Sequence, residues 1–134
     1  MQNSTQIGAT ALRVSLGIMW IAHALLKLLV FTLPGTAQSF ASTGLPGALA
    51  YPVFAAELLG GLMVVLGIYA RQVSLILTPI LLGALWVHAP NGWVFTAPNG
   101  GWEYPAFLAV ASMSQWLIGD GVGTLRSSNR WVPA

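Results

Sequence analysis

The sequence predicts an all-α integral membrane protein, a four-helix bundle with short connections and glycine-rich helix contacts, in one transmembrane domain over residues 1–134. Only 6% of the residues are charged and 56% are hydrophobic, whereas about a quarter of the residues of a soluble domain are charged. Four apolar stretches approach the roughly 17–25 residues that cross a bilayer as a helix. Turn-forming or charged residues separate these stretches. Composition therefore indicates a multi-pass membrane protein.

The four predicted spans cover residues 7–33, 48–69, 73–89 and 102–118. TLPG (32–35) and GLPG (44–47) separate the first two spans, because proline and glycine interrupt helices. The polar segment 36–47 is too short to span the membrane and is either coil or a short interfacial helix. YARQ (69–72) supplies a charged turn before the third span, and GDGVG (119–123) ends the fourth.

The connection between the last two spans contains a small repeat, because APNG occurs at 89–92 and again at 97–100. Asn-Gly pairs favour tight turns. The loop is therefore expected to form a compact double turn or a small hairpin. Two interpretations stay open, a well-ordered connector and a lid over a pocket.

Basic residues set the predicted orientation. Arg13 lies near the start of the first span, Arg71 lies in the second connection, and Arg126 and Arg130 lie in the tail. Positively charged residues favour the cytoplasmic side. The sequence thus predicts that the N- and C-termini lie on the cytoplasmic side of the membrane, with Arg13 as an anchor at the cytoplasmic edge.

Four ionisable residues, one in each span, are expected at the same depth. Lys27 and Glu57 each lie roughly 21 Å, by helix rise, from an arginine at the cytoplasmic rim, and His88 and Glu103 lie roughly 25 Å from that side. An ionised side chain near the middle of a bilayer costs about 2.5–3.5 kcal/mol on insertion scales. These side chains should therefore face the bundle interior, where Lys27 would pair with Glu57 and His88 with Glu103.

This polar layer supplies the candidate site. Lys27, Glu57, His88 and Glu103 are the candidate catalytic residues, and four further side chains near that layer are candidates for binding a substrate or cofactor: Trp20, His23, Trp93 and Trp102. The aromatic side chains of such a site can contact an aromatic ligand, and its ionisable side chains can hydrogen-bond the ligand and move protons.

Less specific interpretations of the same residues stay open. Lys27 can extend its ammonium group to the outer interface, the Lys27–Glu57 pair can be purely structural, and His88 and Glu103 can be solvated at the interface. No metal site is predicted, because the sequence has no HExxH or comparable ligand spacing. The absence of cysteine excludes thiolate chemistry and Fe–S clusters within this chain.

Several segments resemble the DoxX family, in the same order and spacing as in that family, over about residues 8–125. They are LRVSLGIMWIAHALLKL (12–28), GLPG (44–47), ELLGGLMVVLGIYAR (57–71), GGWEYPAFL (100–108) and GDGVGTL (119–125). The resemblance implies a four-helix inner-membrane bundle associated with redox chemistry, since some relatives are subunits of a thiosulfate:quinone oxidoreductase.

The leading functional hypothesis is a redox-associated, quinone-linked membrane subunit with a polar site in the outer half of the bundle. Quinone is the cofactor considered, and whether the chain is itself an enzyme stays open. The expected partners are the lipid bilayer and a membrane or periplasmic redox protein, with no nucleic acid, since no basic stripe is present. The alternatives are a structural or assembly subunit without its own chemistry, and a small-solute transporter, which would require a homo-oligomer.

Overall fold

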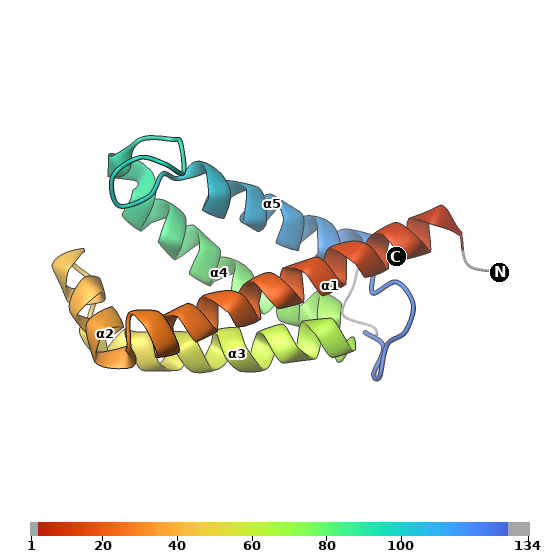
Figure 1. The fold of residues 1–134 in the computed structure, drawn as a ribbon. Helices are drawn as coiled ribbons and strands as arrows, with labels where there is room; N and C mark the ends of the chain where they lie inside the picture. The colour runs from red at the N-terminus through yellow and green to blue at the C-terminus, as the bar shows by residue number, and fades with distance from the viewer. Residues whose placement is uncertain (1–2, 129–134) are drawn as a thin grey trace.

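The computed structural model describes residues 3–128, and its regular structure there is helical (Figure 1). The all-α prediction is confirmed for this range, in which the only strand-like pairing is an isolated bridge between Ile68 and Arg126. The α-helices are α1 (Ser4–Leu25), α2 (Leu33–Ser42), α3 (Ala50–Leu66), α4 (Ala70–His88) and α5 (Glu103–Ile118).

Within residues 3–128, three helical segments are long and apolar enough to cross a membrane: Ser4–Val30, Gly47–Leu66 and Ala70–Asn91. They correspond to the first three predicted spans. The fourth predicted span coincides with α5, which has only 16 residues and falls just short of the roughly 17 residues that a crossing helix needs. That α5 crosses the membrane therefore stays a prediction.

The segment that the sequence left undecided begins as a helix. The first span ends in a π-helix, Leu26–Val30, and α2 starts three residues later. Thr32 adopts a left-handed φ of 65°, and its hydroxyl accepts a hydrogen bond from the amide of Gly35 at 3.2 Å. This N-cap, followed by Pro34 in the first turn, explains why α2 begins there. Gly44, at a φ of 88°, follows the end of α2.

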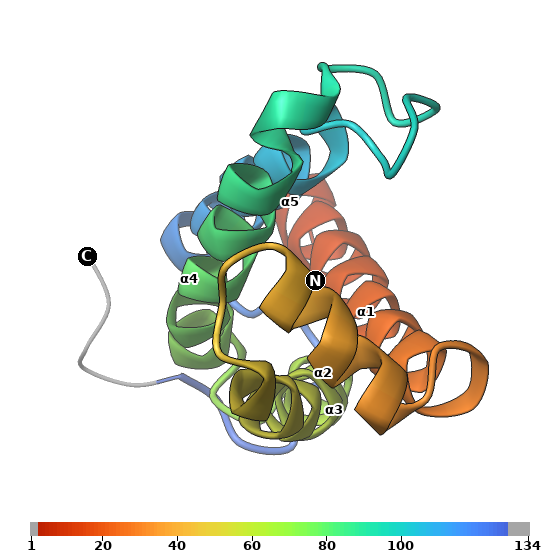
Figure 2. The ribbon, with the colours of Figure 1, turned by 90° about the vertical axis from the view of Figure 1, so that its left-hand side faces the viewer.

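The four long helices pack in pairs. α1 lies along α3 and α4 lies along α5, while α3 contacts α4 and α1 contacts α5 (Figures 1 and 2). The short helix α2 lies across one end of these helices (Figure 2). The hydrophobic core is made by side chains from all four long helices, among them Leu16, Trp20, Val64, Leu77, Leu81 and Leu108.

Glycines bring the backbones of α1 and α3 into close contact. A Cβ atom built at Gly17 would lie 2.7 Å from the backbone nitrogen of Val65 and 2.9 Å from the carbonyl oxygen of Gly61. A Cβ atom at Gly61 would lie 2.9 Å from the Cβ of Trp20. Neither position has room for a side chain, which agrees with the predicted glycine-rich contact and with the use of small residues between membrane helices.

The end of the molecule opposite α2 is closed by arginines. Arg13 is 2% exposed and its guanidinium donates to the carbonyl oxygens of Asp120, Val122 and Gly123. Arg13 is therefore buried and holds the chain that follows α5. That it also anchors the protein at the cytoplasmic edge stays a prediction. Arg71 donates to the carbonyl of Trp116 at 2.7 Å. Two more basic residues were predicted on this side. Arg126 donates to the Tyr69 hydroxyl, and Arg130 lies outside the described residues.

We expect Gly17→Ala to lower the free energy of unfolding by about 1–3 kcal/mol, because the added methyl group would force α1 away from α3. Gly8→Ala in the same helix is the matched control, since nothing lies within 4 Å of a Cβ at that position. The control should be neutral or slightly stabilising. Unfolding of both variants in detergent micelles, followed by circular dichroism, measures the difference; equal stability of the two variants would contradict the close contact.

Candidate functional site

Lys27 and Glu57 form an ion pair between the first span and α3. The Lys27 Nζ lies 3.1 Å and 3.0 Å from the two carboxylate oxygens of Glu57. The Glu57 side chain is 4% exposed and that of Lys27 is 17% exposed. The predicted pairing of these two residues is thus present in the structure, and the lysine does not extend its charge away from the protein as an isolated anchor.

Local backbone geometry places Lys27 in this position. The residue belongs to the π-helix Leu26–Val30, whose wider turn changes the direction in which its side chains project. The Lys27 carbonyl lies 3.5 Å from the hydroxyl of Thr36, which donates a shorter bond of 2.8 Å to the Thr32 carbonyl. The end of the first span and the first turns of α2 are therefore in contact beside the ion pair. Nothing in the sequence signals the π-helix.

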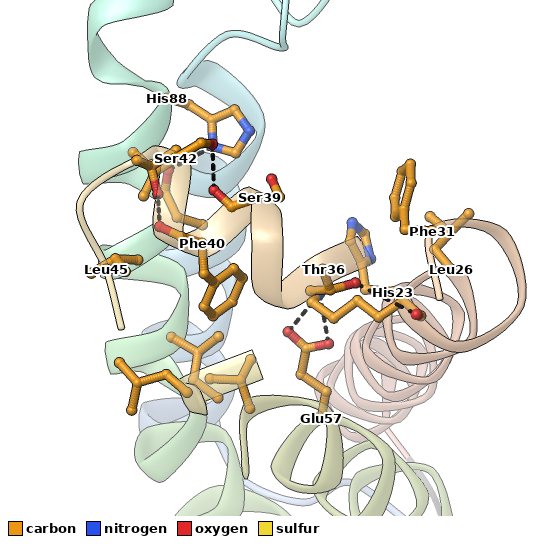
Figure 3. A pocket seen from close by; sticks show the side chains of 18 of the residues that line it. His23, Leu26, Phe31, Thr36, Ser39, Phe40, Ser42, Leu45, Glu57 and His88 are labelled. Carbon is orange, nitrogen blue, oxygen red and sulfur yellow. Dashed lines mark hydrogen bonds and ion pairs between the residues drawn. The ribbon is translucent and has the colours of Figure 1, made fainter. Parts of the chain in front are cut away.

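A cavity of about 1160 Å³ lies beside the ion pair, between α2 and the long helices (Figure 3). One end holds Lys27, Glu57 and His23. The other end holds His88, with Ser39 and Ser42 of α2 close to it (Figure 3). The walls between these polar ends are largely apolar and include Phe40, Leu45, Leu49, Val53, Ile80 and Val87.

The two histidines of the cavity are held in the same way. The Nδ1 of His23 lies 2.8 Å from the carbonyl oxygen of Met19, and the Nδ1 of His88 lies 2.7 Å from that of Ala84. A carbonyl oxygen only accepts hydrogen bonds, so Nδ1 carries the proton in both rings. In a neutral imidazole, Nε2 is then an acceptor, and within residues 3–128 neither Nε2 has a hydrogen-bond partner.

Glu103 lies apart from the other three candidate catalytic residues. It borders a second, open cavity of about 640 Å³ with Phe95, Tyr104 and Phe107. Its carboxylate accepts a hydrogen bond of 3.0 Å from the backbone amide of Phe95. The prediction that His88 pairs with Glu103 is therefore wrong. Glu103, at the start of α5, instead binds the loop that precedes this helix.

The candidate binding residues also separate. His23 lines the large cavity and its ring stacks on Tyr104, with 6.0 Å between the ring centroids. Trp20 is 2% exposed within the hydrophobic core. Trp93 and Trp102 are exposed residues of the loop before α5 and do not border the large cavity. Of the four, only His23 lies where it can contact a ligand in that cavity.

Several residues of the cavity were missed from the sequence. Thr36, Ser39, Phe40 and Ser42 come from α2, and their signal was the polar composition of TAQSFAST within an otherwise apolar chain. The repeat in the loop supplies two more. The Asn91 side-chain amide of the first APNG donates to the carbonyls of Asn99 and Gly100 in the second, so the two copies close on each other as a double turn. Both asparagines border the cavity.

The cavity carries little net charge, because the lysine and the glutamate offset each other. Within the described range, no group of three or more His, Cys, Asp and Glu side chains could hold a metal ion. What the arrangement offers is a set of hydrogen-bonding groups at both ends and one ion pair that can hold or release a proton. Such groups suit an uncharged ligand with an apolar body and polar ends.

Comparison with known proteins identifies the family of this chain. The model of the DoxX family matches residues 8–90. The chain belongs to the DoxX family. This DoxX protein is 40% identical over 85 residues to a Bacillus subtilis (strain 168) protein named "Putative oxidoreductase CatD", and the match covers 63% of this chain and 62% of that relative. The chain thus spans less than two thirds of the relative's length. No solved structure matches it.

We expect the single variants Lys27→Met and Glu57→Leu each to destabilise this DoxX protein, because each leaves one charge without its partner. The loss should be about 3–5 kcal/mol for Lys27→Met, which strands the buried glutamate. It should be smaller for Glu57→Leu, since lysine can extend toward the membrane surface. The double variant should recover most of the stability, and unfolding in detergent micelles measures all three. A double variant no more stable than Lys27→Met would contradict the pairing argument.

Proposed function

We propose that this DoxX protein is a bacterial inner-membrane subunit associated with redox chemistry, and that its large cavity binds a quinone or a similar small oxidisable ring. The observation that carries the proposal is a cavity with polar ends and apolar walls, placed next to an ion pair between the partly buried Lys27 and the buried Glu57. Ionisable residues inside membrane helices commonly belong to substrate or proton pathways. The name of the Bacillus subtilis relative, an oxidoreductase name, supports the same class of function.

The size and chemistry of the cavity fit such a ligand. Its volume of about 1160 Å³ lies slightly above the roughly 300–1,000 Å³ of ordinary small-molecule sites. This leaves room for a ring and part of an apolar tail. Phe40, Leu45 and Val53 would contact the faces of the ring, while the polar side chains at the two ends would hydrogen-bond its oxygens. An apolar ring with polar substituents also partitions into the bilayer, from which the cavity would be filled.

The chemistry that a quinone would supply, if bound, is reduction to the hydroquinone by two electrons and two protons. The chain contains no cysteine, and the electrons would come from a partner redox protein. The role of this chain would be to orient the ring and handle protons. At one end of the cavity Lys27 is a proton donor and Glu57 is a proton acceptor, and His88 lies at the other end.

The topology belongs to the same proposal. We place α5 as the fourth membrane span, because 16 residues extend about 24 Å and lie antiparallel to the longer α4. The end closed by arginines is assigned to the cytoplasm by the positive-inside rule. The cavity under α2 then lies in the outer half of the bundle, and a periplasmic or membrane-bound redox protein could reach it from that side.

A second function keeps one observation in its favour. The Lys27–Glu57 pair is closed and bidentate, as expected if it only fixes the register of the first span and α3 in a structural or assembly subunit. The Lys27→Met/Glu57→Leu double variant distinguishes the two functions. A structural or assembly subunit would keep its function in a stable double variant, whereas a quinone-binding subunit would lose ligand binding.

We expect the purified protein in lipid nanodiscs to bind menadione, its reduced form menadiol, or both. The Lys27→Met/Glu57→Leu double variant should bind the same ligand about tenfold or more weakly. Loss of hydrogen bonds to charged groups, worth about 1.5–3 kcal/mol each, is the reason. Isothermal titration calorimetry under anaerobic conditions measures both, and mass spectrometry detects co-purified quinone. Absence of binding in both redox states, with no co-purified quinone, would refute the proposal.

The orientation can be tested with single cysteines, because the chain has none of its own. Thr96→Cys lies in the loop between α4 and α5, and Ser127→Cys lies after α5; both positions are exposed. In spheroplasts, a membrane-impermeant maleimide should label Thr96→Cys at once and Ser127→Cys only after lysis. Labelling of both positions before lysis would contradict the placement of α5 as a span.

A further inference from the structure

Three of the four hydroxyl groups that border the cavity donate their protons to backbone carbonyls. Thr36 donates to the Thr32 carbonyl at 2.8 Å, Ser42 donates to the Ser39 carbonyl at 2.7 Å, and Thr43 donates to the Phe40 carbonyl at 2.8 Å. A hydroxyl has a single proton, and a carbonyl oxygen can only accept. Toward a ligand, these three side chains therefore present lone pairs.

Three nitrogen-containing side chains of the cavity, those of His23, His88 and Asn91, have the same bias. His23 and His88 have their Nδ1 protons bound to backbone carbonyls, so Nε2 is the acceptor of each ring whenever the imidazole is neutral. Asn91 uses its side-chain nitrogen for two hydrogen bonds, to the carbonyls of Asn99 at 3.2 Å and Gly100 at 2.9 Å. Its Oδ1 is then the part of the amide that stays available.

Few donors remain for a ligand. The Lys27 ammonium group is directed to both carboxylate oxygens of Glu57. The Ser39 hydroxyl and the Asn99 amide are the other donors among the polar side chains that border the cavity. Acceptors therefore outnumber donors, and they occur at both ends of the cavity. A ligand that matches this arrangement must itself carry hydrogen-bond donors at two separate places.

We infer that the cavity selects the reduced form of its ring ligand, a hydroquinone with hydroxyl groups at opposite (para) positions, over the oxidised quinone. This inference rests on the proposed function and assigns the redox state that the site binds. Each hydroxyl donates to acceptors at one end: His23 and Thr36 beside the ion pair, and His88 and Ser42 at the far end (Figure 3). A quinone has only acceptor oxygens, so it would place lone pairs against lone pairs.

The separation of the two ends fits a para-substituted ring. Thr36 and Ser42 lie six residues apart on α2, which corresponds to about 9 Å along the helix. The two oxygens of a para-dihydroxy ring are about 5–6 Å apart, and a hydrogen bond of about 2.8 Å at each end brings the span of matching acceptors to roughly 11 Å. Hydroxyls on neighbouring ring carbons would reach only one end of the cavity.

Menadiol and menadione, the reduced and oxidised forms of one ring, test the inference by anaerobic calorimetry on the wild-type protein in nanodiscs. Two hydrogen bonds of about 1 kcal/mol each predict that menadiol binds about 10–30-fold more tightly. A naphthol with a single hydroxyl should bind about fivefold more weakly than menadiol, because it can satisfy only one end. Equal or tighter binding of menadione would overturn the inference while leaving the proposed function intact; failure of both forms to bind would overturn both.

Variants of His88 test the far end directly. His88→Leu should weaken menadiol binding about fivefold and leave single-hydroxyl naphthol nearly unchanged, since that ligand can use the other end. His88→Gln should retain part of the menadiol affinity, because its amide oxygen can still accept. Trp86→Leu on the same helix is the control, since Trp86 is 60% exposed and does not border the cavity. A His88→Leu variant that weakens both ligands equally, or neither, would contradict the two-ended binding.

Discussion

The need to neutralise Glu57 within an apolar environment governs the arrangement of this DoxX protein. A carboxylate on a short side chain cannot reach the membrane surface from the middle of α3, and its charge is costly unless a partner is close. Lys27 is that partner, at 3.0 Å. The pairing fixes the register of the first span against α3, and the contact between Gly17 and Gly61 allows the two backbones to come near enough for it. The π-helix Leu26–Val30, which contains Lys27, and the start of α2 then lie beside the pair.

Neutralisation of the pair also determines what kind of cavity can exist beside it. An unpaired lysine or glutamate would attract an ion of opposite charge, whereas a closed pair leaves a site for an uncharged ligand. The chemistry of that site is then set by α2. As a short helix with hydroxyl side chains, it bonds its own carbonyls with those hydroxyls and turns their lone pairs outward. A polar helix thereby becomes an acceptor surface.

Sequence reasoning could find the long helices and the Lys27–Glu57 pair, because apolar length and helix rise are one-dimensional properties. It could not separate His88 from Glu103, since residues at equal depth can face different directions around the bundle. His88 faces α2, whereas Glu103 binds the amide of Phe95 in its own loop. The contribution of α2 was hidden for a related reason. Its polar residues marked a segment outside the spans, and only the turn at Thr32 folds that segment back over the helices.

The two ends of the molecule are held together in different ways. At one end, Arg13 and Arg71 hold the carbonyls at and after the end of α5, through contacts between residues far apart in the sequence. At the other end, α2 is joined to the spans through Thr32 and Gly44, both in left-handed backbone conformations, and makes fewer contacts with the long helices. Because the arginines hold the chain after α5 and the Lys27–Glu57 pair fixes the register of the first span against α3, the α2 end can retain an open volume without loss of that register. A cavity at that end is therefore compatible with a stable small membrane protein, even though its walls lack the packing of the core.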